Sequence, residues 1–169
     1  YVVYTSDHGD TMGEHGVFFK STLYEGSVGI PLILKGPGIE KNVKEESPVS
    51  LLDIFQSAIE FTGGKHTKED KTLPGVSLIK TLKNPNYNRP IYSEYQSFCF
   101  YTSAFMLRKG KYKYIYYCGE RPQLFDLKSD PLENNDLGEN PNYEEVRSLL
   151  EKELSSMVEY EKVDKEAVE

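Results

Sequence analysis

Tryptophan is absent from this sequence of 169 residues, and cysteine occurs only twice, at Cys99 and Cys118. Two cysteines cannot form the set of disulfides that stabilises small secreted domains, so we expect both to be reduced structural thiols. No apolar run approaches the roughly 20 residues that span a bilayer, and no stretch has the pattern of a signal peptide. We therefore expect no membrane partner, and the localisation stays open, as cytoplasmic or as periplasmic or secreted.

Positive charge is scarce too, with 20 Lys and Arg residues against 27 Asp and Glu residues and a formal net charge of -7. Because nucleic acids and anionic membranes attract clustered cations, this balance argues against both as partners. The alternating Lys and Tyr residues of 111–117 resemble a base-stacking platform, but the acidic balance and the lack of an RNP-type motif favour an amphipathic strand. With 38% hydrophobic and 12% aromatic residues, the chain can form a core.

Residues typical of a functional site are concentrated in Thr5–Gly26, which contains His8, His15, four acidic residues and four glycines. A β-favouring run, 1–4, precedes this stretch and would deliver Asp7 and His8 to a sheet edge, where open α/β folds place ligands. A carboxylate beside an imidazole suits a metal ion, and Lys20 adds a cation for a negatively charged substrate oxygen. The same residues also fit an ordinary strand end with an Asx turn, so composition leaves both interpretations open.

Two motifs carry a resemblance to a known family. The first is S-D-H-G-D-x-x-G-E-H-G from Ser6, and the second is K-x-x-x-Y-E-G-S-x-x-x-P-L-I-L-K-G-P-G from Lys20. Together they resemble the second half of a sulfatase of the alkaline-phosphatase superfamily. The similarity runs from Tyr1 to about Leu137, and the segment 123–131 is similar to the C-terminal LYDL-x-x-DP turn of that family.

The resemblance implies roles for three residues. Asp7 and His8 would coordinate the active-site divalent cation, and Lys20 would contact the sulfate and stabilise charge near the bridging oxygen. Calcium is the metal that the resemblance implies, although an imidazole ligand also suits manganese or zinc. His15 would either hydrogen-bond near the site or cap the loop.

The chain departs from the family pattern at the nucleophile. Sulfatases use a formylglycine made in a C-x-[PA]-x-R motif beside an Asp-Asp pair, and this sequence contains neither. We therefore expect the chain to be the C-terminal portion of a longer enzyme, whose N-terminal half is its partner and supplies the formylglycine. A small-molecule sulfate ester is the expected substrate, the isolated chain is expected to be inactive, and a homo-oligomer is left open.

Two alternatives concern function. A phosphodiesterase or phosphonate monoester hydrolase of the same superfamily would share the second-half motifs, and a non-catalytic binding or assembly module would retain the site without its chemistry. Within the sulfatases, the segment around Glu94 is similar to that of choline-sulfatase-like members. A carboxylate beside tyrosine rings suits a quaternary ammonium group, whereas an exposed strand end is the alternative for Glu94.

The predicted fold class is α/β. Residues 1–86 would form the C-terminal part of an alkaline-phosphatase-like sheet with a flanking helix, and residues 87–169 a small antiparallel α+β subdomain with a long C-terminal helix. In the first part we expect strands at 1–4 and 29–35, the second fully buried, and a helix at 50–62 that has Ser50 as its N-cap and packs its apolar face on the sheet. A short helix is expected near 78–82.

In the second part, tyrosine-rich runs predict four strands, at 91–95, 103–108, 111–117 and 123–127. The connection 108–111 indicates a hairpin. Alternation in the third strand predicts a wet face carrying Lys111 and Lys113 and a dry face carrying Tyr112 and Tyr114. A helix should begin near 140–145 and extend to Val158, and the charged tail from Glu159 should fray.

Overall fold

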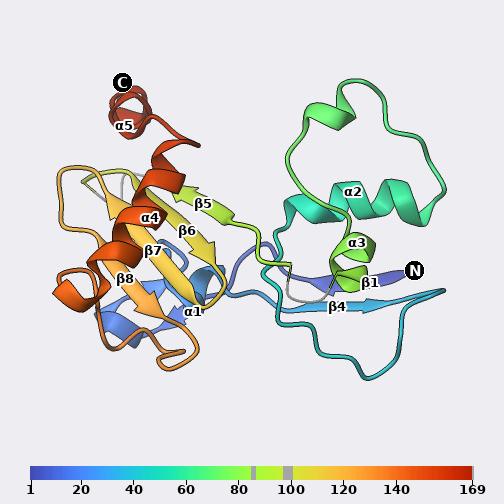
Figure 1. Ribbon diagram of the computed structural model, residues 1–169, viewed down its shortest axis with the longest axis horizontal. Coiled ribbons are helices and arrows are strands. Elements are labelled where there is room, and N and C mark those ends of the chain that lie inside the picture. Colours follow the sequence, from blue (N-terminus) through green and yellow to red (C-terminus); the bar gives the residue numbers. More distant parts are fainter. Residues whose placement is uncertain (85–86, 97–100, 169) are drawn as a thin grey trace. The chain divides into compact units, whose positions relative to one another are not determined.

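The computed structural model describes residues 1–84, 87–96 and 101–168 (Figure 1). The chain divides into two compact units: unit 1 contains Tyr1–Asp7 and Pro31–Arg89, and unit 2 contains His8–Ile30 and Pro90–Glu169. The segment His8–Ile30, which we expected in the first domain, thus makes its contacts within unit 2. The expected boundary at Asn86 lies outside the described residues, as does Cys99, and the predicted domain division stays a prediction.

Unit 1 contains the two predicted strands, β1 (Val2–Thr5) and β4 (Leu32–Lys35), which pair antiparallel from Val2 opposite Lys35 to Thr5 opposite Leu32. The prediction that the second strand is fully buried is wrong, because Ile33 is 62% exposed. Within the described residues the pair has no third strand, so apolar side chains of both strands face solvent.

The predicted helix is confirmed as α2 (Leu52–Phe61), and the predicted short helix as α3 (Leu78–Lys83), with a 3-10 turn at η2 (Asp70–Thr72) between them. The predicted packing of α2 is wrong, since Phe55 is 45% exposed and Asp53 is fully buried. The reason is a polar anchor: the Asp53 carboxylate accepts the N–H groups of Ser50 and Val76 and pairs with Arg89. The helix starts one residue later than predicted, with Leu51 at the N-cap position.

Unit 2 is built on the predicted four-stranded antiparallel sheet, in the order β5 (Ile91–Tyr95), β6 (Ala104–Lys109), β7 (Tyr112–Tyr117), β8 (Gln123–Asp126) (Figure 1). The predicted hairpin joins β6 to β7 with Lys109 opposite Tyr112, and Gly110 adopts φ 57 in its turn. Its dry face is covered as expected, because Tyr114 is fully buried. The predicted wet face is wrong at Lys113, which is also fully buried.

Both faces of this sheet are covered. On one face lies a cluster that includes Phe105, Tyr114 and Leu124 of the sheet with Leu150 and Leu154 of α4 (Glu144–Ser155). On the other face, Leu23 of the N-terminal segment packs with Ala104, Met106, Ile115 and Phe125. Because successive strand residues point to opposite faces, the segment 8–30 therefore lies across the sheet from α4.

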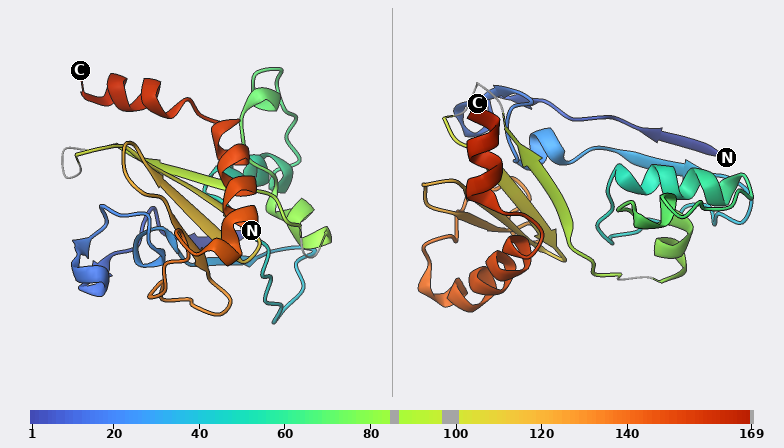
Figure 2. Two further views of the ribbon diagram at one scale, coloured as in Figure 1. Left: turned by 60° about the vertical axis from the view of Figure 1, so that its left-hand side comes forward. Right: turned by 90° about the horizontal axis from the view of Figure 1, so that it is seen from above.

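The C-terminal region corrects one prediction. The turn η3 (Pro141–Tyr143) leads into α4, which ends at Ser155, and a separate helix, α5 (Tyr160–Val168), follows in place of the frayed tail (Figure 2). Tyr160 holds α5 against the sheet of unit 2. The centroid of its ring lies 4.3 Å from that of Tyr116 and 5.3 Å from that of Phe105. Among the described residues, no helix has the length and apolar character needed to cross a membrane.

Candidate functional site

His8, His15 and Lys20 lie in the loop that begins unit 2. This loop contains the short hairpin of β2 (Thr11–Met12) and β3 (Phe18–Phe19), the turn η1 (Glu14–Gly16) and the one-turn helix α1 (Glu25–Val28). Its glycines let the backbone fold back on itself. A Cβ on Gly9 would lie 2.3 Å from the carbonyl oxygen of Gly26, so only glycine allows this approach.

The structure brings His8 and Lys20 together. Lys20 Nζ lies 3.0 Å from His8 Nε2, and the other ring nitrogen, Nδ1, lies 2.9 Å from the Gly9 carbonyl oxygen. A carbonyl accepts only from N–H, so the proton of a neutral imidazole belongs on Nδ1 and the lone pair on Nε2. The lone pair therefore points to the side of the ring where the Lys20 ammonium lies.

Asp7 is the last residue of the first stretch of unit 1, and His8 follows it directly in the chain. The Asp7 side chain is exposed, and Ser6 Oγ donates a hydrogen bond to its Oδ1 at 3.3 Å. The assignment of Asp7 and His8 as a ligand pair rests on their adjacency in the sequence and stays a prediction.

The donor set fits one part of a metal site. One ring nitrogen of His8 is oriented by a backbone carbonyl, as is usual for a metal-binding histidine, and the other, Nε2, contacts the Lys20 ammonium, which would have to move aside for a metal ion to bind there. Asp7 would add a hard carboxylate oxygen, as calcium or manganese prefers. Among the described residues no group of three or more His, Cys, Asp or Glu side chains forms a metal cluster, so further ligands would have to come from elsewhere.

Helix α1 holds this loop in place through Ser27, which is buried. The Ser27 hydroxyl donates to the Lys20 carbonyl oxygen at 2.5 Å, and the Ser27 carbonyl oxygen accepts the Gly9 N–H at 2.7 Å. The Thr22 N–H also donates to the Lys20 carbonyl oxygen, at 2.8 Å. One residue of α1 thus fixes the backbone next to His8 and the backbone of Lys20.

His15 lies elsewhere in the same loop. Its ring stacks on that of Tyr24 with 4.0 Å between centroids, and its backbone adopts φ 55, which is uncommon for a residue other than glycine. His15 therefore contacts the segment that leads into α1.

Glu94 lies on β5, and its exposed carboxylate accepts a hydrogen bond from the Tyr92 hydroxyl. Burial, together with that carboxylate, raises the pKa of Tyr92 well above its usual value, so the phenol stays neutral and remains a donor. The pair presents a carboxylate beside an aromatic ring.

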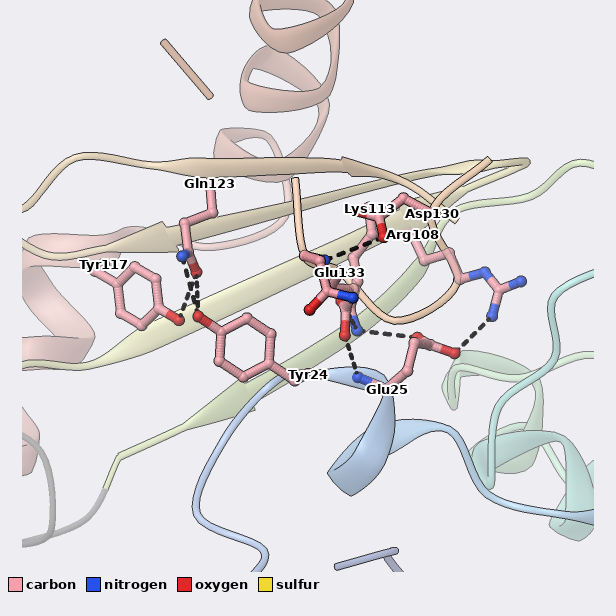
Figure 3. A network of polar contacts seen from close by, with 9 residues as sticks. Tyr24, Glu25, Arg108, Lys113, Tyr117, Gln123, Asp130 and Glu133 are labelled. Atoms are coloured by element: carbon pink, nitrogen blue, oxygen red, sulfur yellow. Dashed lines mark hydrogen bonds and ion pairs between the residues drawn. The ribbon is translucent and has the colours of Figure 1, made fainter. Parts of the chain in front are cut away.

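Sequence reasoning missed a buried ion network beneath α1 (Figure 3). Lys113 of β7 contacts two carboxylates, those of Glu25 and Glu133, at 2.9 and 2.8 Å. A signal existed, since a lysine flanked by tyrosines in the middle of a core strand must find an anion if it is buried. Strand alternation predicted instead that Lys113 is exposed, because alternation carries no information on what covers each face of a sheet.

Comparison with known proteins gives a consistent family. The family model described as N-sulphoglucosamine sulphohydrolase, C-terminal, matches residues 13–160. Arylsulfatase K of Mus musculus is 38% identical over 174 residues, which cover 96% of this chain and 31% of that protein. The choline-sulfatase of Rhizobium meliloti (strain 1021) is 36% identical over 140 residues, covering 83% of this chain and 27% of that protein.

Solved structures confirm the predicted fold class. A 2-O GAG sulfatase, BT1596, matches with a TM-score of 0.72 and 29% identity, over 91% of this chain and 36% of that one. The phosphonate monoester hydrolase of Agrobacterium radiobacter matches with a TM-score of 0.70 over 91% of this chain and 34% of that one. At 24% identity, the second likeness shows the fold alone. This chain spans less than a third of the length of the curated relatives named above.

Proposed function

We propose that the whole protein is a sulfuric ester hydrolase. The reason is that this chain belongs to the sulfatases, whose C-terminal region the matching family model describes. The family predicted from the two sequence motifs is thereby confirmed, and the activity is our proposal. In the proposed enzyme, this chain supplies ligands for the metal and the sulfate, and the formylglycine nucleophile belongs to a part of the protein outside this chain.

The observation that carries the proposal is the 3.0 Å distance between Lys20 Nζ and His8 Nε2. An ammonium group and an imidazole nitrogen thus lie close together on one loop, whose backbone is held by Ser27, which supports the proposal. Both groups can bind a negatively charged oxygen: the ammonium by direct contact, and the imidazole through a metal cation that it holds. A sulfate ester presents several such oxygens on one small group.

In the proposed reaction, Lys20 is the residue of this chain that contacts the substrate without the help of a metal ion. Its ammonium donates hydrogen bonds to the sulfate and stabilises the negative charge that develops on the bridging oxygen as the S–O bond breaks. Asp7 and His8 would hold the divalent cation, with calcium our first assignment and manganese the second. When bound, this cation polarises the sulfate oxygens.

We propose that the main partner of this chain is the remainder of a catalytic domain, which packs on unit 1. Supporting this, Ile33, Leu52 and Phe55 are 62%, 51% and 45% exposed, although each would contribute about 1.5–3 kcal/mol if fully buried. On this account, the isolated chain lacks the nucleophile and is inactive.

The test is release of inorganic sulfate from an aryl sulfate by the whole natural protein that contains this sequence, with calcium and after chelation. Lys20→Ala should lower kcat/KM about 100-fold to 1,000-fold, as for other groups that stabilise transition-state charge. Lys44→Ala is the matched control, because Lys44 is exposed and pairs with Glu46 in unit 1.

Three outcomes would contradict the proposal or a part of it. Faster hydrolysis of a phosphonate monoester or phosphodiester, with the same dependence on Lys20, would identify a related hydrolase. No hydrolysis of any of these esters would favour a binding or assembly module. Sulfate release by the isolated chain would refute the assignment of the nucleophile to a part outside it.

A further inference from the structure

A lysine buried in the sheet of unit 2 is linked to the loop that carries His8 and Lys20. The Lys113 side chain is fully buried, and its Nζ lies 2.9 Å from Glu25 Oε1 and 2.8 Å from Glu133 Oε1 (Figure 3). Arg108 Nη1 lies 3.5 Å from the second carboxylate oxygen of Glu25. Two cations thus face two carboxylates, and the removal of one member would leave an uncompensated charge in a dry environment.

Glu133 also binds the backbone of α1. Its Oε2 accepts the N–H of Glu25 at 2.6 Å, so one carboxylate contacts both the sheet lysine and the first turn of the helix. Glu133 adopts φ 56, and its own N–H donates to the Asp130 carbonyl oxygen at 3.2 Å. A glutamate kept in a backbone conformation that favours glycine, with its side chain 1% exposed, is held there by its surroundings.

Helix α1 carries the constraint onward to the candidate site. Glu25 begins the helix, and Ser27, two residues later, contacts the backbone at both Gly9 and Lys20. The chain of contacts therefore runs from β7, through two carboxylates and one turn of helix, to the residues that flank the His8–Lys20 pair. Every member belongs to unit 2.

We propose that Lys113 and Glu133 are positioning residues for the His8–Lys20 site, acting through α1. They touch neither the substrate nor the reacting atoms. Their neutralised charges fix Glu25, Glu25 fixes the helix, and Ser27 sets the distance between the Gly9 and Lys20 backbones. The catalytic meaning rests on the proposed sulfatase function, whereas the mechanical coupling can be measured without it.

The variants are chosen to separate positioning from folding. Lys113→Met alone leaves the buried Glu133 carboxylate unpaired and risks unfolding. The double variant Lys113→Met/Glu133→Leu removes one cation and one anion together and leaves Glu25 with Arg108, and such apolar replacements of buried pairs are often tolerated. Lys109→Met is the matched control, because Lys109 pairs with Glu153 at 2.8 Å and so joins the same sheet to α4 rather than to α1.

The first readout is amide hydrogen–deuterium exchange in the whole natural protein, resolved by residue. In the double variant, the Gly9 and Thr22 amides, which donate to Ser27 and Lys20, should exchange at least tenfold faster. The Met157 amide, which donates to the Leu154 carbonyl oxygen at 2.9 Å beyond the end of α4, should stay within twofold of wild type. Lys109→Met should leave the Gly9 and Thr22 amides unchanged.

The second readout is kinetic. With an aryl sulfate, kcat of the double variant should fall at least tenfold while KM stays within threefold, because a displaced Lys20 loses transition-state contacts first. Glu133→Gln keeps an acceptor for the Glu25 N–H, so its kcat should fall less than that of the double variant.

The proposal is overturned if the Gly9 and Thr22 amides exchange within twofold of wild type. It is also overturned if the Met157 amide accelerates as much as they do, which would indicate general destabilisation. Absence of sulfate release by the wild type refutes the proposed function but leaves the exchange result valid. An active wild type whose double variant has normal exchange refutes only the positioning role.

Discussion

His8 Nε2 lies 3.0 Å from Lys20 Nζ, although twelve positions separate these residues in the chain. The intervening residues form the β2–β3 hairpin, which returns the chain to its starting point. Lys20 is therefore placed by the loop's own backbone and by Ser27, rather than by a neighbouring strand. The candidate site depends on how this loop is supported, and its support lies in the sheet of unit 2.

Asp53 should be a strong determinant of the stability of unit 1. Its buried carboxylate accepts two backbone N–H groups and pairs with Arg89, whose side chain is 14% exposed. Asp53→Ala should lower the free energy of unfolding by about 3–5 kcal/mol, because it leaves the guanidinium unpaired. Urea denaturation followed by circular dichroism measures this change.

Glu46→Ala is the control for Asp53, since the Glu46–Lys44 pair is exposed to solvent and should contribute little to stability. Equal denaturation midpoints for the two variants would refute the structural role of Asp53.

Tyr160 should matter in spite of its position near the C-terminus. Its side chain is buried against the rings of Phe105 and Tyr116, so Tyr160→Ala should destabilise unit 2 by about 3–5 kcal/mol. Tyr101→Ala, at a fully exposed tyrosine, is the control and should change the stability by less than about 0.5 kcal/mol. If thermal unfolding does not distinguish the two variants, α5 is not docked on the sheet.

Cys118 should react slowly with thiol reagents. Burial, with a smaller contribution from Asp164 and Glu161, raises the pKa of its thiol to about 11. A raised pKa keeps the thiol protonated, so at pH 8 the reactive thiolate should be about a hundredfold scarcer than in an unfolded chain. In a Cys99→Ser background, the rate of alkylation should rise about tenfold per pH unit from pH 8 to pH 10. A rate that levels off below pH 9 would contradict this pKa.

Glu94 should affect the choice of sulfate ester rather than the chemistry. If its carboxylate and the Tyr92 ring receive a quaternary ammonium group, Glu94→Gln should raise KM for choline sulfate by about tenfold, equivalent to about 1.4 kcal/mol. Turnover of an aryl sulfate whose aryl group is uncharged should be unchanged and serves as the control. Unchanged kinetics with choline sulfate would remove Glu94 from the substrate site.

Local patterns predicted the elements well because they depend on neighbours in the chain. The helical spacing of 50–62, the tyrosine-rich strands and the hairpin before Lys111 all occur as expected. The same patterns failed on burial. Phe55 faces solvent and Asp53 is buried, because polar contacts of unit 1 decided which face of α2 is covered.

For the candidate site, the motifs indicated Asp7, His8 and Lys20, and the structure brings His8 and Lys20 into contact. The motifs gave no indication of the support beneath α1. Lys113 and Glu133 lie 20 positions apart and some 90 or more positions from Lys20, so only the folded chain shows that they meet Glu25.

The sequence by itself determined the family, the main strands and helices, and the residues at which chemistry is expected, since motifs and periodicity are properties of adjacent residues. Tertiary structure decided which side chains are covered and what holds the loop in place. Lys113 shows the physical reason: alternation placed it on a wet face, but the segment 8–30 folds over that face and supplies Glu25, so the lysine is buried and paired with two carboxylates.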